Sequence, residues 1–191
     1  MHTFTEAIVV KGKIVEKVEV PQGVEVQLSG NDIMVKAQGK ENSRHFKSTN
    51  VRLVKKDNVI EVWSKSDKKN LMAESWTVAS HIRNLIAGVQ GDYNCRLEVV
   101  YSHFPMNVSV KDGFVEINNL AGAKHPRKSK IVGASKVEVK GKDITVRGQN
   151  KEHVGQTSAN MEQATRIKGK DIRIYQDGIY ITQKTRLEEK A

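Results

Sequence analysis

The chain has 191 residues, with 32 Lys and Arg against 22 Asp and Glu, which gives a net charge of +10. This length predicts one or two domains, and a surface of this charge attracts polyanions. The longest apolar runs, Ala7–Val10 and Leu85–Val89, are too short for a signal-peptide core or a membrane span. The single cysteine, Cys95, excludes an internal disulfide and is expected to be a structural thiol in a cytosolic protein.

The sequence of the first half predicts two β-hairpins followed by one helix. Apolar residues alternate through 24–35 around a Ser-Gly-Asn-Asp turn, and again through 51–62 around Lys-Asp-Asn, as in half-buried antiparallel strands. A spacing of three to four residues over 70–89 then predicts an amphipathic helix. The helical period places Trp76 in the core.

The second half predicts the same kinds of element. Hairpins are expected over 108–117, where Asp-Gly supplies a strong turn signal, and over 137–146. A helix follows over 154–165 with Asn150 as its N-cap. Another hairpin is predicted over 172–181, from the spacing of its isoleucines around a second Asp-Gly pair.

The two halves also resemble each other directly. VQLSGNDIMVK (26–36) and VEVKGKDITVR (137–147) match at six positions, at an offset of 111 residues. Such similarity indicates a duplicated module. The sequence therefore predicts an α+β fold of two tandem similar domains, each a helix packed against small antiparallel sheets. With the boundary near 101–105, the domains are residues 1–100 and residues 101–191.

The positive charge is concentrated in the second half. Residues 1–100 carry 15 Lys and Arg against 12 Asp and Glu, whereas residues 101–191 carry 17 against 10. The stretch 124–173 alone carries 13 against 5. This concentration favours a localised anionic partner over a general role in solubility.

The first basic segment, 122–130, lies between predicted strands. It has no acidic residue and no apolar period, so we expect a loop that projects into solvent. Its cations are Lys124, Arg127, Lys128 and Lys130.

The second basic segment, 166–173, connects the second helix to the last predicted hairpin. Alternation is expected to turn Arg173 outward and Ile172 and Ile174 inward. Gly169 lets the backbone approach a phosphate closely, because no Cβ intervenes. The cations of this segment are Arg166, Lys168, Lys170 and Arg173.

Either basic segment alone is equally consistent with a solvated surface, but two in one half favour a nucleic-acid partner. Neutralising about five phosphates would give a log–log salt slope near −4.5. Aromatic residues make up only 5% of the chain, and none lies between Lys124 and Lys130. This pattern disfavours a protein that stacks successive bases of a single strand, and favours recognition of a folded RNA by backbone and shape.

The sequence gives no signal for an active site, a cofactor or a metal. Its six histidines are scattered, without the short spacings of a metal site. It has no Gly-rich phosphate loop of the Walker type and no dinucleotide-binding fingerprint. We therefore expect neither an enzyme nor a cofactor-binding protein.

Four stretches resemble the large-subunit ribosomal protein L-six family in its archaeal and eukaryotic form. The resemblance extends from about Val20 to Lys184 and is closest in the second half. It leaves residues 1–18 unmatched, and the stretch TFTEAIVVKGKIVEK (3–17) within them is expected to be an extra strand. In this chain Ala-Gly-Ala-Lys at 121–124 replaces a more usual Leu-Gly-Glu-Lys. The four stretches are YSHFPMNVSV (101–110), AGAKHPRKSK (121–130), VGQTSANMEQATRIKGKDIR (154–173) and DGIYI (177–181).

This resemblance implies a non-enzymatic structural constituent of the large ribosomal subunit, located in the cytoplasm and not in a membrane. It implies that the C-terminal domain binds large-subunit rRNA near the sarcin–ricin loop. Neighbouring ribosomal proteins would contact the chain, and translation factors would bind nearby. The implied rRNA contacts are Arg166, Lys168, Gly169, Lys170 and Arg173, with Lys124, Arg127, Lys128 and Lys130 as further contributors.

Three other functions compete with this interpretation. A free-standing RNA- or DNA-binding factor would use the same basic residues outside the ribosome. An enzyme acting on RNA would need a general base beside the cations, and His125 and His153 are the candidates. A protein-interaction scaffold would leave the charge concentration in 124–173 without a use.

Overall fold

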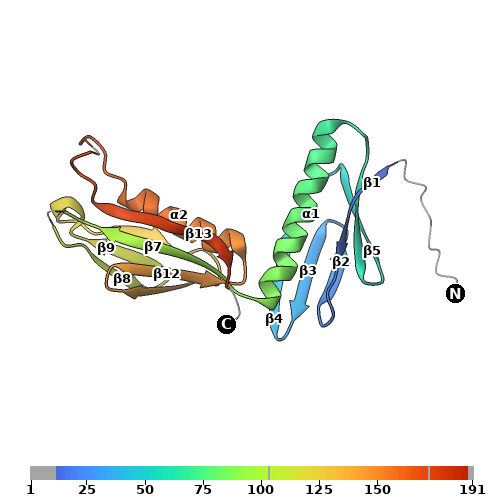
Figure 1. The fold of residues 1–191 in the computed structure, drawn as a ribbon, viewed down its shortest axis with the longest axis horizontal. Helices are drawn as coiled ribbons and strands as arrows, with labels where there is room; N and C mark the ends of the chain where they lie inside the picture. Colours follow the sequence, from blue (N-terminus) through green and yellow to red (C-terminus); the bar gives the residue numbers. More distant parts are fainter. Residues whose placement is uncertain (1–11, 103, 172, 189–191) are drawn as a thin grey trace. The chain divides into compact units, whose positions relative to one another are not determined.

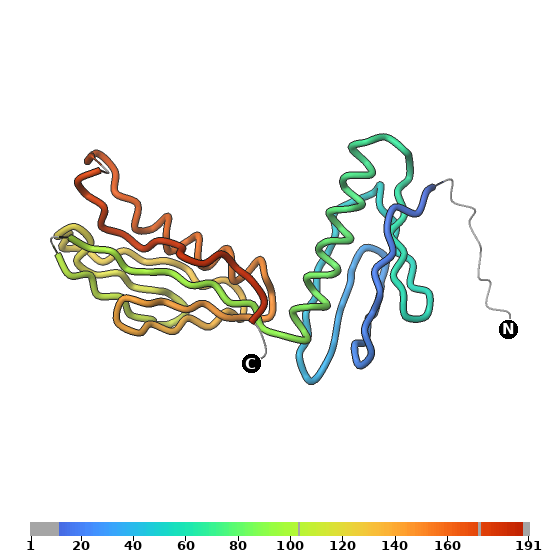
Figure 2. Tube along the Cα trace, in the orientation of Figure 1, coloured from blue at the N-terminus to red at the C-terminus, as the bar shows by residue number. Residues whose placement is uncertain are grey.

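The computed structural model of the protein describes residues 12–102, 104–171 and 173–188. It divides into two compact units, Met1–Val89 and Gln90–Ala191 (Figures 1 and 2). In the described residues, each unit has one α-helix and two antiparallel sheets. The predicted α+β class with two tandem similar domains is confirmed.

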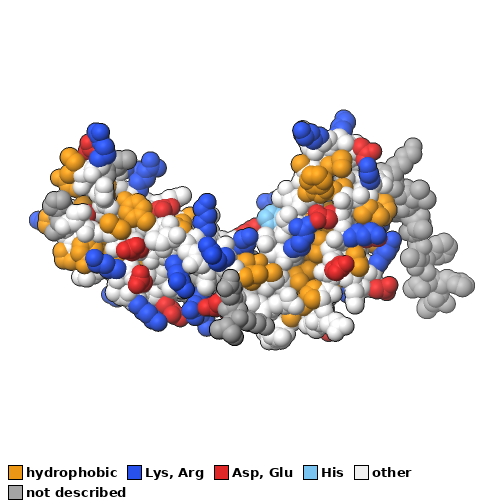
Figure 3. Space-filling model, viewed as in Figure 1, with side chains coloured by type: hydrophobic (Ala, Val, Ile, Leu, Met, Phe, Trp, Pro, Cys, Tyr) orange, Lys and Arg blue, Asp and Glu red, His pale blue; other side chains and the backbone are white. Residues whose placement is uncertain are grey.

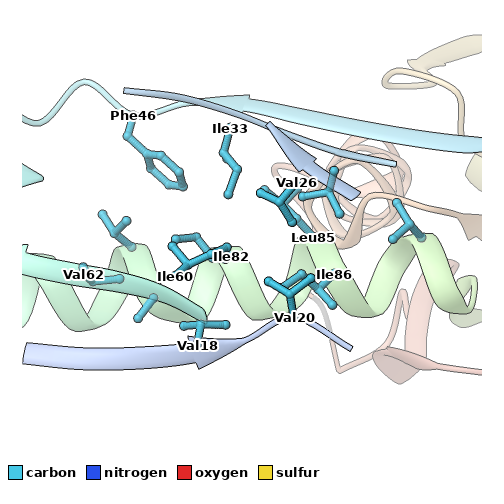
Figure 4. Packing of buried hydrophobic residues seen from close by; sticks show 14 of the residues in the cluster. Val18, Val20, Val26, Ile33, Phe46, Ile60, Val62, Ile82, Leu85 and Ile86 are labelled. Carbon is cyan, nitrogen blue, oxygen red and sulfur yellow. The ribbon is translucent and has the colours of Figure 1, made fainter. Parts of the chain in front are cut away.

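The first unit contains two three-stranded sheets and the helix α1, Lys69–Gln90. Side chains of α1, such as Ile82 and Leu85, pack among those of both sheets, including Ile33 and Ile60 (Figure 4). One sheet has the order β1 (Lys13–Glu19), β6 (Val59–Ser64), β5 (Val51–Lys56). The other has the order β2 (Glu25–Ser29), β3 (Asp32–Ala37), β4 (Lys40–His45).

The apolar face of α1 follows the predicted helical period, with one exception. Val78, Ile82 and Val89 are buried against the sheets. Trp76 is 56% exposed, so its predicted place in the core is wrong. It lies beside the buried stripe rather than on it, and the helical spacing alone did not separate these two positions.

The second unit packs the helix α2, Lys151–Thr165, against a four-stranded sheet and a three-stranded sheet. Asn150 caps α2 as predicted, because its side chain accepts hydrogen bonds from the backbone N–H groups of Glu152 and His153. The larger sheet has the order β11 (Lys136–Lys140), β12 (Asp143–Gly148), β7 (Tyr93–Val100), β13 (Gly178–Leu187). The smaller has the order β10 (Arg127–Lys130), β9 (Phe114–Asn118), β8 (Asn107–Lys111).

Strand β7 belongs to the second unit, so the division between the units lies before it. It pairs with β12 on one side and with β13 on the other, at the centre of the larger sheet. Cys95 lies on β7, is buried, and donates to the carbonyl oxygen of Gln183 at 3.2 Å, as expected of a structural thiol. The division therefore lies between Val89 and Gln90, before the boundary predicted near 101–105.

The internal repeat is present, but its sequence match equates the wrong hairpins. Residues 26–36 form β2 and β3, whereas residues 137–147 lie in β11 and β12, whose position in the chain and sheet corresponds to that of β5 and β6. The equivalent pairs of turn-flanking residues, Lys56↔Val59 and Lys140↔Asp143, differ by 84 residues rather than 111. The similarity at 111 reflects a shared hairpin pattern.

Candidate nucleic-acid interface

The first basic segment is partly a strand. Residues 127–130 form β10, which pairs with β9 along its whole length, so the predicted loop is confined to the residues before Arg127. Ser129 is buried while Lys128 and Lys130 on either side of it are exposed. A charged edge strand of this kind carries little apolar periodicity, which is why the sequence indicated a loop.

Glu116 on β9 neutralises part of the positive charge of β10. Its carboxylate lies 3.2 Å from the Lys128 ammonium and 3.5 Å from that of Lys111. The hydrogen bond from Lys128, with the charge of Lys111 nearby, holds the pKa of Glu116 below its ordinary value of 4.5. Lys128 is therefore shared with an acid.

This ion pair predicts a pH-dependent contribution to stability. Because the folded pKa is depressed, the contribution is complete above pH 4.5 and is lost as the pH falls through the lower folded value. Glu116→Gln should therefore be less stable than wild type at pH 7, and the difference should narrow below pH 4.5. Chemical denaturation at both pH values measures it, with the exposed Glu138→Gln as control; a constant difference would contradict the prediction.

Arg127 joins the two basic segments. Its Nη1 donates to the carbonyl oxygen of Ala164 at 2.8 Å and to that of Arg166 at 3.0 Å, at the C-terminal end of α2. These carbonyls have no partner within the helix, so the guanidinium acts as a cap. Asn160 Nδ2 also donates to the Lys130 carbonyl oxygen at 3.1 Å. The strand and the helix end are thereby held side by side.

Arg127→Ala should destabilise the second unit by about 2 kcal/mol, because two hydrogen bonds from a charged donor are lost. Lys124→Ala removes the same charge from an exposed residue and should change stability by no more than about 0.5 kcal/mol. Urea denaturation followed by far-ultraviolet circular dichroism measures both. Equal effects would show that Arg127 is only a surface cation.

The second basic segment forms turns rather than the start of a hairpin. The backbone N–H groups of Ile174 and Tyr175 donate to the carbonyl oxygen of Asp171, at 3.1 and 2.9 Å, which closes a turn. The strand begins only at Gly178, so the predicted hairpin over 172–181 is wrong. Ile174 is 62% exposed and does not point inward, and Ile172 lies outside the described residues.

The Asp171 carboxylate explains this turn. It accepts from the backbone N–H of Arg173 at 2.9 Å, as Asp side chains do in turns, and pairs with the Arg173 guanidinium at 3.1 Å. Hydrogen bonds from the Arg173 side chain and backbone hold the pKa of Asp171 below its ordinary value. The Arg173 side chain is 87% exposed, so it points outward as predicted.

Gly169 and Lys170 have local structural roles. Gly169 has φ +76°, a conformation that glycine adopts without strain, and an added Cβ would meet no atom within 4 Å. The Lys170 Nζ lies 4.3 Å from the centroid of the Tyr175 ring, a cation–π contact.

The remaining predicted contacts are exposed cations: Lys124, Lys130, Arg166 and Lys168. Within the described part of the chain, none of the four has an acidic partner within 4.0 Å. On the face drawn in Figure 3, Lys and Arg side chains occur over each unit, so exposure alone does not define an interface. What distinguishes these four is that they lie on two segments joined by Arg127.

No group of three or more His, Cys, Asp or Glu among the described residues is arranged to hold a metal ion. No described helix is both long enough and apolar enough to cross a bilayer. His125 is exposed, and the ring of His153 packs on Gly133.

Fold and charge thus define a tandem α+β protein with a basic second unit. A family model described as ribosomal protein L6 matches residues 20–92, nearly all of them in the first unit, and residues 104–178 in the second unit. The chain belongs to the ribosomal protein L6 family, which confirms the resemblance seen in the sequence.

Archaeal relatives match nearly the whole chain. The large ribosomal subunit protein uL6 of Methanobrevibacter smithii is 44% identical over 177 residues, which cover 93% of this chain and 99% of that protein. The protein of the same name from Methanothrix thermoacetophila is 45% identical over 172 residues, covering 90% and 98%. That from Archaeoglobus fulgidus is 46% identical over 172 residues, covering 87% and 88%.

Proposed function

We propose that this protein is a structural, non-catalytic constituent of the large ribosomal subunit and binds large-subunit rRNA through its second unit. Arg127 carries the proposal, because its bonds to the end of α2 present two basic segments as one surface. A surface formed before binding loses less ordering entropy on association. The archaeal relatives are each named as a large ribosomal subunit protein, which supports the proposal that this protein belongs to the same particle.

The contacts we assign are Arg166, Lys168, Gly169, Lys170, Arg173, Lys124, Lys128 and Lys130, with Arg127 both positioning the surface and adding charge. Family resemblance favours a location near the sarcin–ricin loop, with translation factors and other ribosomal proteins as neighbours. Phosphate contacts of this type fix orientation and give strong salt dependence.

Sedimentation of a tagged chain tests the proposal against a free-standing RNA-binding factor. A ribosomal constituent should co-sediment with large subunits in stoichiometric amount and should remain after a high-salt wash. A free factor would be found mainly in the soluble fractions or would be removed by salt. Mainly soluble protein would overturn the proposed function.

A further inference from the structure

A pocket lies in the second unit between the C-terminal end of α2 and the start of β13. Its volume is about 350 Å³, within the range of small-ligand sites, and much of its surface is apolar. The sequence predicted a hairpin over 172–181 and gave no sign of a pocket. The residues that line it include Thr165, Arg166, Tyr175, Asp177 and Tyr180.

Asp177 lines the pocket and carries a buried carboxylate oxygen. The residue is only 3% exposed, and its Oδ1 accepts from the backbone N–H of Ser102 at 2.7 Å. Its Oδ2 is buried and has no hydrogen-bond partner among the described residues. Burying a polar oxygen without a partner is costly, so a ligand that donates to Oδ2 would gain this energy.

The aromatic walls of the pocket are held in place. The Tyr180 hydroxyl donates to the carbonyl oxygen of Gln176 at 3.0 Å. Gly178 lies against the Tyr180 ring, since an added Cβ would be 3.4 Å from its Cε2 atom. The Lys170 ammonium lies 4.3 Å from the centroid of the Tyr175 ring. Two oriented rings at an apolar pocket suit a flat ligand.

We propose that this pocket binds one unpaired guanine base of an RNA, stacked on a tyrosine ring and donating N–H groups to Asp177. Guanine carries two adjacent donors, its ring N1–H and its 2-amino group. Oδ2 can accept one, and Oδ1 has a second acceptor position free for the other, because a carboxylate oxygen accepts twice. Unpaired bases splayed out of folded RNA are commonly recognised by stacking and edge hydrogen bonds.

The surrounding charge favours RNA over a protein segment. Arg166 lines the pocket, as does Glu162, whose carboxylate accepts from the backbone N–H of Ile181 at 3.4 Å. The exposed cations Lys168 and Arg173 follow Arg166 in the chain. They would attract the phosphates on either side of an inserted base. A basic peptide aimed at the Asp177 carboxylate would instead be repelled by these cations, and an acidic one by the carboxylate itself.

Short RNAs test this inference, which rests on the proposed function. The pentaribonucleotides UUGUU, UUAUU and UUUUU are titrated into the full-length protein, and amide shifts of Ser102, Gly178 and Ile179 are followed by NMR. We expect UUGUU to bind roughly tenfold more tightly than the other two. Asp177→Asn, which keeps the acceptor for Ser102, should abolish the preference, whereas the exposed Asp143→Asn should preserve it.

A second variant, at a more exposed residue, keeps the test valid if Asp177→Asn does not fold. Tyr180 is 44% exposed, and Tyr180→Leu should weaken UUGUU binding roughly tenfold through lost stacking. Equal affinity for the three RNAs, or a preference unchanged in Asp177→Asn, would overturn the guanine site. So would Asp177-dependent binding of an Arg-rich peptide.

A Lys168→Ala/Lys170→Ala variant, measured on an rRNA fragment, separates the two proposals. If it loses affinity while Asp177→Asn does not, the guanine site fails and the proposed function stands. If the wild-type protein binds no rRNA, both fail.

Discussion

Replacing Lys168 and Lys170 together with alanine should weaken binding to a large-subunit rRNA fragment roughly 60-fold near 0.1 M salt. Losing two phosphate contacts reduces the log–log salt slope by about 1.8. Over the tenfold range of salt between about 0.1 and 1 M, this difference in slope amounts to about 60-fold in affinity. Both residues are exposed, so the fold should be retained. Binding isotherms at several salt concentrations give the slope and the affinity together.

The matched control for this variant is Lys65→Ala with Lys68→Ala. It removes the same net charge from two exposed lysines of the first unit, which lie three residues apart in the chain rather than two. It should leave the affinity within about twofold and the slope nearly unchanged. An equal loss in both double variants would mean that overall charge, rather than the second unit, binds the RNA.

The largest stability effects are expected from Ile60→Ala and Ile144→Ala, at equivalent positions in the two cores. Both side chains are fully buried, so each truncation should destabilise its own unit by about 2–5 kcal/mol. Both tryptophans of the chain, Trp63 and Trp76, belong to the first unit, so their fluorescence reports its unfolding. Ile60→Ala should shift the fluorescence transition in urea to lower concentration.

Ile144→Ala should leave the fluorescence transition unchanged and shift only the part of the circular dichroism signal that comes from the second unit. It should also weaken RNA binding under conditions where the second unit is partly unfolded, whereas Ile60→Ala should not. If Ile144→Ala moved the fluorescence transition as far as Ile60→Ala does, the two units would unfold as one. The separate cores would then not act as separate folding units.

The parts of the fold that sequence predicted best are those with strong local signals. The hairpins β2–β3, β5–β6, β8–β9 and β11–β12 alternate clearly and have Asp, Asn or Gly at their turns. The cap at Asn150 was predicted because its chemistry is local. The edge strands β4 and β10 were missed, since their order comes from pairing with β3 and β9 rather than from their own polar sequences.

The candidate site was predictable in composition but not in arrangement. Lys and Arg in 124–130 and 166–173 were evident from the sequence. The sequence could not show that Arg127 is bonded to the end of α2, because the partners are 37 and 39 residues away. The turn centred on Asp171 was missed because alternating isoleucines imitate a strand while the carboxylate determines the backbone.

Crosslinking of intact large subunits, mapped to residue and nucleotide, tests the assignment of the rRNA-binding surface most directly. We predict crosslinks from residues 124–130 and 166–173 to large-subunit rRNA. The exposed Lys65 and Lys68 should give no RNA crosslinks of comparable yield. Particles that contain the protein but whose residues 124–130 and 166–173 form no RNA crosslinks and stay open to solvent would contradict the account.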